Sequence, residues 1–340
     1  MYRLHYLLLA VLTMTIVSCG SGDDPEQELS PEEQEFLEQQ KQKEATNKWI
    51  YYQMHRNYLW ADQMPDSASC DYTLDGDKFF KTLVIANDRF SYCSTNYSYS
   101  PSTRITIPEG TTSVYLDSIY RVGNKKVGYL CYLEFNAESD LHAPFKRFYE
   151  QKIDDLILDL RYNRGGNVST SRYLCSSIVD ENAYGKLFQK HVFNERLSGV
   201  NYRETGDSAI RYNFYTVADT VGRKILYLLN LKRVFVLTSN QTASASEATI
   251  VCLHPFMNVI TIGEQTVGKG VGSRMFSDTQ YRYELHPVTF RYYNIEGNSV
   301  PDNGIVPDYP ISGGTDIDQN LLGNTNEPYL KKAIELILQQ

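Results

Sequence analysis

A serine in a run of small residues and a lysine between two glycines are the residues of this chain best suited to covalent chemistry. They are Ser244, in Thr-Ala-Ser-Ala-Ser-Glu, and Lys269, in Gly-Lys-Gly. A serine hydroxyl becomes a nucleophile when a base removes its proton, and a neutral lysine amine can be that base. Ser-Lys pairs are a known variant of serine hydrolase chemistry. The pair therefore predicts a nucleophile and its base, although each residue alone also fits a solvated loop.

An apolar segment, 156–160, runs into the glycine pair Gly165 and Gly166. Its composition is typical of a buried strand covered by helices. Glycines allow the backbone to turn its N–H groups toward a ligand, as an oxyanion hole requires. We expect one such donor from Gly165 or Gly166, and a second from the N–H of Ala245, the residue after the serine.

Four motifs in this order resemble the C-terminal processing peptidase family (tail-specific proteases) over roughly residues 121–311. They are LDLRYNRGG, SASE, GEQTVGKG and NGIVPD. The resemblance implies a crotonase/ClpP-like α/β core with a largely parallel sheet. It implies a serine endopeptidase in which Ser244 attacks and Lys269 takes the proton. It also implies a peptide or protein substrate, with no cofactor and no metal.

The resemblance leaves the supporting residues open. Glu247 occupies the family position of a carboxylate that supports the pair, but it fits a structural helix charge equally well. Several relatives carry a glutamine four residues after the lysine, where this chain has the shorter Ser273. Ser246 is a competing nucleophile, but helical spacing puts it on a different face from Ser244, and the family motif assigns Ser244.

From residue 127 to 340, the expected peptidase core, strands alternate with helices. Expected strands cover 127–135, 153–160, 234–239, 259–263 and 281–291, and expected helices cover 141–151, 169–178, 243–253 and 327–338. This alternation predicts a largely parallel sheet with both faces covered. Residues 180–225 show the weakest pattern, and we expect them to form an excursion over the cleft.

A small helical domain is expected over residues 45–92, with amphipathic helices at 47–60 and 77–86. It resembles the region that precedes the protease core in Bacteroides-type members. Before it, residues 19–44 read as a tether and a polar helix. That helix begins at Ser30, which with Pro31 and Glu33 has the composition of a helix start with a capping box.

Members of this family usually carry a PDZ domain between the helical region and the core. Here the interval 93–126 is too short for such a domain with a core of its own. We expect it to be a connecting loop with short strands, at 103–107 and 113–115. Without a PDZ domain, we expect substrate recognition not to depend on a free C-terminal carboxylate.

The amino terminus has the features of a targeting signal. Residues 1–18 combine Arg3 with an apolar stretch too short to span a bilayer, as in a signal peptide. The run Ile-Val-Ser-Cys resembles a bacterial lipobox and predicts lipidation of Cys19. We therefore expect a membrane-anchored outer-membrane lipoprotein of the bacterial cell envelope. The acidic stretch after Cys19 resembles a surface-export signal of lipoproteins in the Bacteroides group.

The composition excludes one class of partner. The 340-residue chain has a net charge of −8 and no basic run, which argues against nucleic acid. The oligomeric state is not indicated. A second function remains open: a catalytically weak or inactive protein that binds a peptide or another ligand on the same fold. The absent PDZ domain and the replaced glutamine favour it, and the intact Ser244 and Lys269 oppose it.

The cysteines and histidines indicate no metal site, because no CxxC or paired His/Cys spacing occurs. Three cysteines, Cys131, Cys175 and Cys252, lie in apolar runs and are expected to be buried. Cys70 and Cys93 are the only pair considered for a disulfide, since both lie in polar loops beside one helix.

Overall fold

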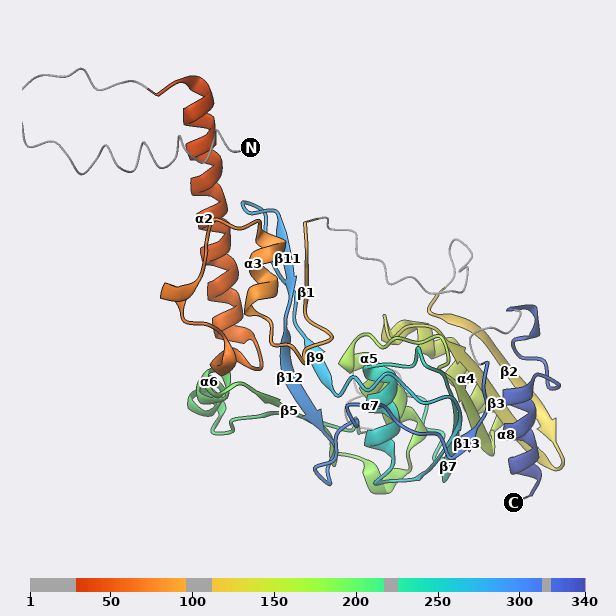
Figure 1. Ribbon diagram of the computed structural model, residues 1–340. Helices are drawn as coiled ribbons and strands as arrows, with labels where there is room; N and C mark the ends of the chain where they lie inside the picture. Colours follow the sequence, from red (N-terminus) through yellow and green to blue (C-terminus); the bar gives the residue numbers. More distant parts are fainter. Residues whose placement is uncertain (1–28, 96–111, 217–225, 314–318, 340) are drawn as a thin grey trace, which may run out of the picture.

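The computed structural model describes residues 29–95, 112–216, 226–313 and 319–339, and it has two lobes (Figure 1). The core lobe contains a six-stranded sheet with helices on both faces. The second lobe contains the long helix α2 (Pro31–Asn57), helix α3 (Gly76–Leu83) and two smaller sheets. The expected signal peptide, Cys19 and the strand at 103–107 lie outside the described residues.

The sheet of the core lobe has the strand order β13-β8-β7-β4-β3-β2. Its neighbours are parallel except for the antiparallel pair β2 and β3. The bounds are β2 Val114–Val122, β3 Lys125–Tyr132, β4 Asp155–Asp159, β7 Arg233–Thr238, β8 Asn258–Gly263 and β13 Tyr309–Pro310. The expected α/β fold with a largely parallel sheet is confirmed.

Helices cover both faces of this sheet. Helices α4 (His142–Gln151), α5 (Val168–Ile178) and α7 (Ala245–Leu253) pack on one face, and α8 (Pro328–Leu338) packs on the other. Successive strand side chains point to opposite faces. Leu156 and Leu158 of β4 accordingly join the first core cluster, while Ile157 joins the second. The three central residues of β4 are therefore apolar and buried on both faces, as the sequence predicts, and a buried aspartate stands at each end of the strand.

The second lobe combines helices with antiparallel strands, all of which except β1 come from the C-terminal half of the chain. One sheet has the order β6-β5-β12-β9 and the other β1-β11-β10. The bounds are β1 Tyr92–Ser94, β5 Leu187–Phe193, β6 Ile210–Asn213, β9 Val271–Ser273, β10 Phe276–Asp278, β11 Tyr283–His286 and β12 Val288–Tyr293; helix α6 spans Glu195–Thr205. Short 3-10 helices span Ala61–Gln63, Ser67–Ser69, Glu138–Leu141, Glu181–Ala183 and Gln319–Leu321.

The helical region shares one hydrophobic core with these strands. Ile50 and Met54 of α2 and Phe79 of α3 cluster with Val271 and Leu285 of the strands, and all five are buried. Residues 45–92 therefore fold against the C-terminal half of the chain. Their removal would expose this shared core to water.

Several expected boundaries differ from the structure. One continuous helix, α2, replaces the polar helix and the separate helix expected at 47–60. The Lys, Glu, Ala and Thr residues between them are all compatible with a helix. The start of α2 is confirmed, with Ser30 and Glu33 forming the capping box. The strand expected at 281–291 is two strands, β11 and β12, separated at Pro287, which lacks the N–H that a ladder needs.

Two stretches expected to be irregular contain regular structure. Residues 180–225 include β5, α6 and β6. Strand β5 lacks the usual apolar pattern because it buries the polar residues Gln189 and His191. In the interval 93–126, the short strand expected at 113–115 is the start of β2, which is longer than expected and forms an edge of the core sheet.

The cysteines form no disulfide among the described residues. Cys70 and Cys93, the pair considered for a bridge, are both free and pack at the edge of the second lobe's core. The expectation for the other three is confirmed, since Cys131, Cys175 and Cys252 are free and buried.

Candidate active site

Ser244 lies in the turn between β7 and α7, at the N-cap of that helix, with φ 57° and ψ −117°. A non-glycine residue at positive φ is strained, and such strain is common at functional sites. Gly165 makes the turn possible, because a Cβ added there would lie only 2.7 Å from the Ser244 Cβ. The turn therefore needs a serine in a strained conformation packed directly against a glycine.

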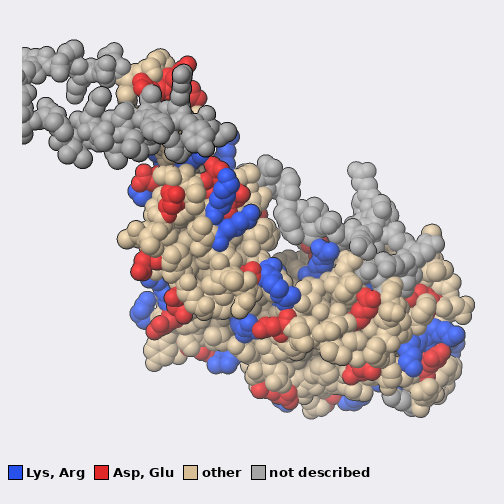
Figure 2. Space-filling model, viewed as in Figure 1, with Lys and Arg blue, Asp and Glu red and all other residues tan. Residues whose placement is uncertain are grey.

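A cavity of about 240 Å³ brings the expected site residues together. Its lining includes Ser244, Lys269, Ala245, Gly166 and Ser273. The cavity lies between the helices α5 and α7 of the core lobe and the strands β9 and β12 of the second lobe. Figure 2 shows the surface hollowed between the two lobes, with basic side chains at the rim of the hollow.

Lys269 contributes an amine whose surroundings favour the neutral form. Burial lowers the pKa of Lys269 from its usual 10.5, against the weaker opposing influence of the Glu247 and Asp88 carboxylates. Its Nζ lies 5.4 Å from the centre of the Phe90 ring. Within the described part of the chain, no hydrogen bond joins this Nζ to the Ser244 Oγ. Lysine and serine therefore share the cavity without a hydrogen bond between their side chains.

Glu247 is completely buried and fixes the serine turn to the lysine loop. Its Oε2 accepts the N–H groups of Ser244 and Lys269, each at 2.8 Å. Its Oε1 accepts the Gly268 N–H at 2.7 Å and the Thr266 hydroxyl at 2.5 Å. Four donors around one carboxylate compensate for its burial.

Tyr292 of β12 is buried and binds the same two residues through their carbonyl groups. Its hydroxyl lies 3.1 Å from the Ser244 carbonyl oxygen and 3.0 Å from that of Lys269. A phenol has one proton, so the two carbonyls share it. Sequence reasoning missed Tyr292, because nothing local distinguishes it from the other tyrosines of the chain.

The backbone donors expected at the oxyanion hole divide into two kinds. The Gly165 N–H already donates to the Asn163 Oδ1 at 2.8 Å, so Gly165 acts as a spacer and not as a donor to substrate. Among the described residues, the N–H groups of Gly166 and Ala245 have no partner. Ala245 begins α7, where a helix leaves its first N–H groups unpaired. Asn163, whose Nδ2 donates to the Tyr132 carbonyl at 2.9 Å, was not expected to contribute.

The two remaining serines have different surroundings. Ser246 is fully buried and donates to the Asn163 carbonyl oxygen at 3.0 Å, so it faces away from the cavity. Ser273 lines the cavity, and its buried Oγ has no partner among the described residues. It makes no hydrogen bond with Lys269, so the structure gives no direct contact that replaces the orienting glutamine.

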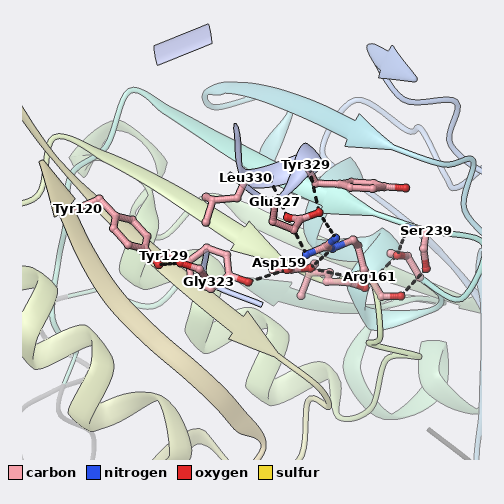
Figure 3. A network of polar contacts seen from close by, with 11 residues as sticks. Tyr120, Tyr129, Asp159, Arg161, Ser239, Gly323, Glu327, Tyr329 and Leu330 are labelled. Atoms are coloured by element: carbon pink, nitrogen blue, oxygen red, sulfur yellow. Dashed lines mark hydrogen bonds and ion pairs between the residues drawn. The ribbon is translucent and has the colours of Figure 1, made fainter. Parts of the chain in front are cut away.

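A buried ion network holds β4 on the side of the sheet opposite the cavity (Figure 3). The Arg161 guanidinium donates to Asp159 Oδ2 at 2.6 Å and to Glu327 Oε1 at 3.0 Å, and all three side chains are inaccessible to solvent. Glu327 also accepts the N–H groups of Tyr329 and Leu330, at the start of α8. The network therefore ties the C-terminal helix to the strand that leads into the glycine pair.

The described residues show neither a metal site nor a membrane-spanning helix. No group of His, Cys, Asp and Glu side chains there is arranged to hold a metal ion. None of the helices in the same residues has both the length and the apolar character needed to cross a membrane.

The fold and the site together define an α/β protein with an N-terminal helical region. Its candidate nucleophile, Ser244, lies at the end of a strand of the largely parallel sheet. The chain belongs to peptidase family S41. The model of that family matches residues 126–311, and the model of the peptidase S41 N-terminal domain matches residues 45–92.

Individual relatives agree with this assignment. The carboxyl-terminal-processing peptidase 1 of the Arabidopsis thaliana chloroplast is 28% identical over 200 residues, 55% of this chain, and the match spans 34% of that relative's length. A solved Bacteroides fragilis protein described as an S41 protease superimposes with a TM-score of 0.71 at 23% identity, covering 85% of this chain and 96% of its own. A peptidase-like Parabacteroides merdae structure gives a TM-score of 0.51 at 14% identity, covering 87% and 96%. The two structural likenesses concern the fold.

Proposed function

We propose that this protein is a serine endopeptidase of the C-terminal processing type that uses Ser244 and Lys269. The observation that carries the proposal is their common cavity, in which Glu247 and Tyr292 bind the backbone of both residues. The substrate is a peptide segment of another protein. Exported proteins are the expected source, given the signal-peptide character of residues 1–18.

Acylation begins when the neutral Lys269 amine takes the Ser244 hydroxyl proton as Oγ bonds to the scissile carbonyl carbon. The lowered pKa of Lys269 increases the neutral fraction available for this step. The resulting ammonium gives the proton to the leaving amine as the C–N bond breaks. Water then hydrolyses the acyl ester with the same amine as base.

The oxyanion that develops on the substrate carbonyl is stabilised by the N–H groups of Gly166 and Ala245. Both residues line the cavity beside Ser244. Because no described group occupies these donors, they need no rearrangement to accept the developing charge. Loss of one donor of this kind typically costs ~10²–10³ in rate.

A non-enzymatic peptide-binding protein is the second candidate. It is favoured by the absence of a hydrogen bond between Ser244 Oγ and Lys269 Nζ within the described structure, and by Ser273 in place of glutamine. Catalytic hydrogen bonds often tighten only when substrate binds. A covalent probe therefore separates the two candidates better than geometry does.

The experiment is labelling with a fluorescent fluorophosphonate, followed by mass-spectrometric localisation of the adduct. We expect labelling of Ser244 in the wild type, none in Ser244→Ala, and strongly slowed labelling in Lys269→Ala. Ser246→Ala is the matched control, because that serine faces away from the cavity and the variant should still be labelled. An unlabelled wild type that binds peptides would favour the non-enzymatic candidate.

We also propose that Cys19 anchors the protein as an outer-membrane lipoprotein, on the evidence of the lipobox-like run. Cys19→Ala should abolish acyl labelling and leave a soluble or unprocessed form. Protease added to intact cells tests surface exposure separately, and replacement of the acidic stretch after Cys19 should then protect the protein. Normal acyl labelling of Cys19→Ala would contradict the anchor.

A further inference from the structure

One arginine at the cavity is used by nothing in the mechanism above. Arg164 follows β4, directly before the glycine pair, and lines the cavity with Ser244 and Lys269. Its side chain is exposed. Among the described residues it has neither a hydrogen bond nor an ion pair, whereas the neighbouring Arg161 is fully paired. An unpaired guanidinium that lines the same cavity as the candidate nucleophile is available to a ligand.

The rest of the cavity lining carries no opposing charge. It contains Arg164, Lys269 and His286, but no aspartate or glutamate. His286 is itself paired with Glu284, which does not line the cavity. Glu247 lies beneath, but both of its oxygens are occupied by four donors. In a chain of net charge −8, the cavity lining itself has no acidic side chain, and Asp88, Glu247 and Glu284 lie outside it.

Two helices add to this polarity. Helix α7 begins at Ala245, with Ser244 as its N-cap. Helix α5 begins beside the cavity at Val168, with no side chain capping its first turn. The amino end of a helix carries a partial positive charge and unpaired N–H groups. The arginine and both helix ends therefore face one small space. This combination favours an anion more than the arginine would alone.

We propose that Arg164 binds a carboxylate of the substrate, so that the cleft selects peptides with a carboxylate close to the bond that is cut. The inference rests on the proposed peptidase function for the class of ligand. A guanidinium recognises a carboxylate through two parallel N–H···O contacts, which fixes orientation as well as position. The carboxylate comes either from an acidic side chain or from the substrate's own C-terminus, and these two sources differ in their response to amidation.

The test measures binding without turnover. The Ser244→Ala variant is titrated with a series of fluorescent peptides, otherwise neutral, in which a single Glu occupies each position in turn. Each peptide has a matched Gln counterpart, and each is made with a C-terminal acid and with a C-terminal amide. At one or more positions we expect Glu to bind about tenfold more tightly than Gln. High salt should reduce this ratio, because Arg164 is exposed. If the amide form loses the same factor instead, the terminal carboxylate is the ligand.

Two further variants assign the effect to Arg164. In Ser244→Ala with Arg164→Gln the acid preference should disappear, and with Arg164→Glu it should turn toward a Lys-containing peptide. The gain of a new preference excludes simple unfolding as the cause. Arg203→Gln, an exposed arginine on α6, is the matched control and should keep the preference of the parent variant.

The outcomes separate this inference from the proposed function. The role of Arg164 is overturned by any of three results: equal binding of all matched pairs, binding of none of the peptides, or an acid preference that persists in Arg164→Gln. Fluorophosphonate labelling of the otherwise wild-type protein reports independently on catalysis. An Arg164-dependent preference in a protein that is never labelled supports the carboxylate site and overturns the peptidase.

Discussion

Glu247 and Tyr292 bind the same two residues with opposite polarity. The carboxylate accepts the N–H groups of Ser244 and Lys269, and the phenol donates toward their carbonyl oxygens. The nucleophile turn and the lysine loop are thus fixed to each other through the backbone. Within the described structure their side chains are not joined by a hydrogen bond, which suits a pair that must meet only when substrate is present.

Tyr292→Phe keeps the packed ring and removes only the shared proton. Both carbonyl groups then lose a donor, at a cost of ~1–3 kcal/mol in the free energy of unfolding. We expect fluorophosphonate labelling of Ser244 to slow about tenfold, because a similar loss of free energy in positioning the serine would raise the reaction barrier by about that factor. Tyr293→Phe, on the next residue of β12, is the control. Equal labelling of both variants would show that Tyr292 has no positioning role.

Glu247→Gln decides between the two interpretations of that carboxylate. A helix charge at the first turn contributes ~0.3–1 kcal/mol. A buried acceptor of four hydrogen bonds contributes more, because the new amide NH₂ must face two of the four existing donors. We expect a loss of ~3 kcal/mol or more in denaturant unfolding, since a buried charged partner is involved. Labelling of Ser244 should fall in parallel. A loss within the helix-charge range, with labelling retained, would establish the structural interpretation.

Lys269 predicts the pH dependence of catalysis. Only the neutral amine acts as base, and burial lowers its pKa below 10.5. The labelling rate of Ser244 should therefore rise with pH, with a midpoint below 10.5. A midpoint at or above 10.5 would contradict a desolvated base.

The same shift affects stability with a definite sign. In the folded state the Lys269 pKa is lowered, so its protonation opposes folding as pH falls from 10.5 through the lowered value. Lys269→Met should therefore raise the free energy of unfolding at neutral pH while strongly slowing the labelling of Ser244. The gain should shrink as pH approaches 10.5. Lys81→Met, at an exposed position of α3, should show no such pH-dependent gain.

Gly165→Ala tests the close approach beside the nucleophile. The added Cβ would lie 2.7 Å from the Ser244 Cβ and 2.9 Å from the Ala245 nitrogen, at φ 106°. Gly206→Ala is the control, because Gly206 also has positive φ but has no atom within 4 Å of the added Cβ. We expect Gly165→Ala to lose labelling and to unfold at a clearly lower temperature than Gly206→Ala. Similar thermal unfolding and labelling in both variants would mean that the serine turn can shift without cost.

Glu327→Ala tests the buried network behind the sheet. The variant leaves the Arg161 guanidinium short of one buried partner and removes the acceptor at the start of α8. Loss of one member of a buried ion pair costs ~3–5 kcal/mol. Denaturant unfolding should show a loss of this size. Glu44→Ala, which removes an exposed ion pair with Lys48, should change stability by less than about 1 kcal/mol.

Much of the core lobe follows from local pattern. Its strands are short apolar runs and its helices are periodic, so their order predicts the parallel sheet. Strand β5 was not predicted, because the polar residues Gln189 and His191 are buried in it. The prediction was wrong at Pro287, which divides one expected strand into two. In these places tertiary packing outweighs the pattern that local sequence displays.

The sequence by itself determined that a serine in a small-residue turn and a lysine between glycines occur in the order of one peptidase family. Only the tertiary structure decided which groups surround them. Tyr292 binds the Ser244 carbonyl from 48 residues away in the chain. The Gly165 N–H, an expected oxyanion donor, already donates to Asn163. Arg164 and Arg161 look alike in one motif, yet one is exposed and the other buried. Such differences depend on which distant segments pack together, and local spacing carries no record of that.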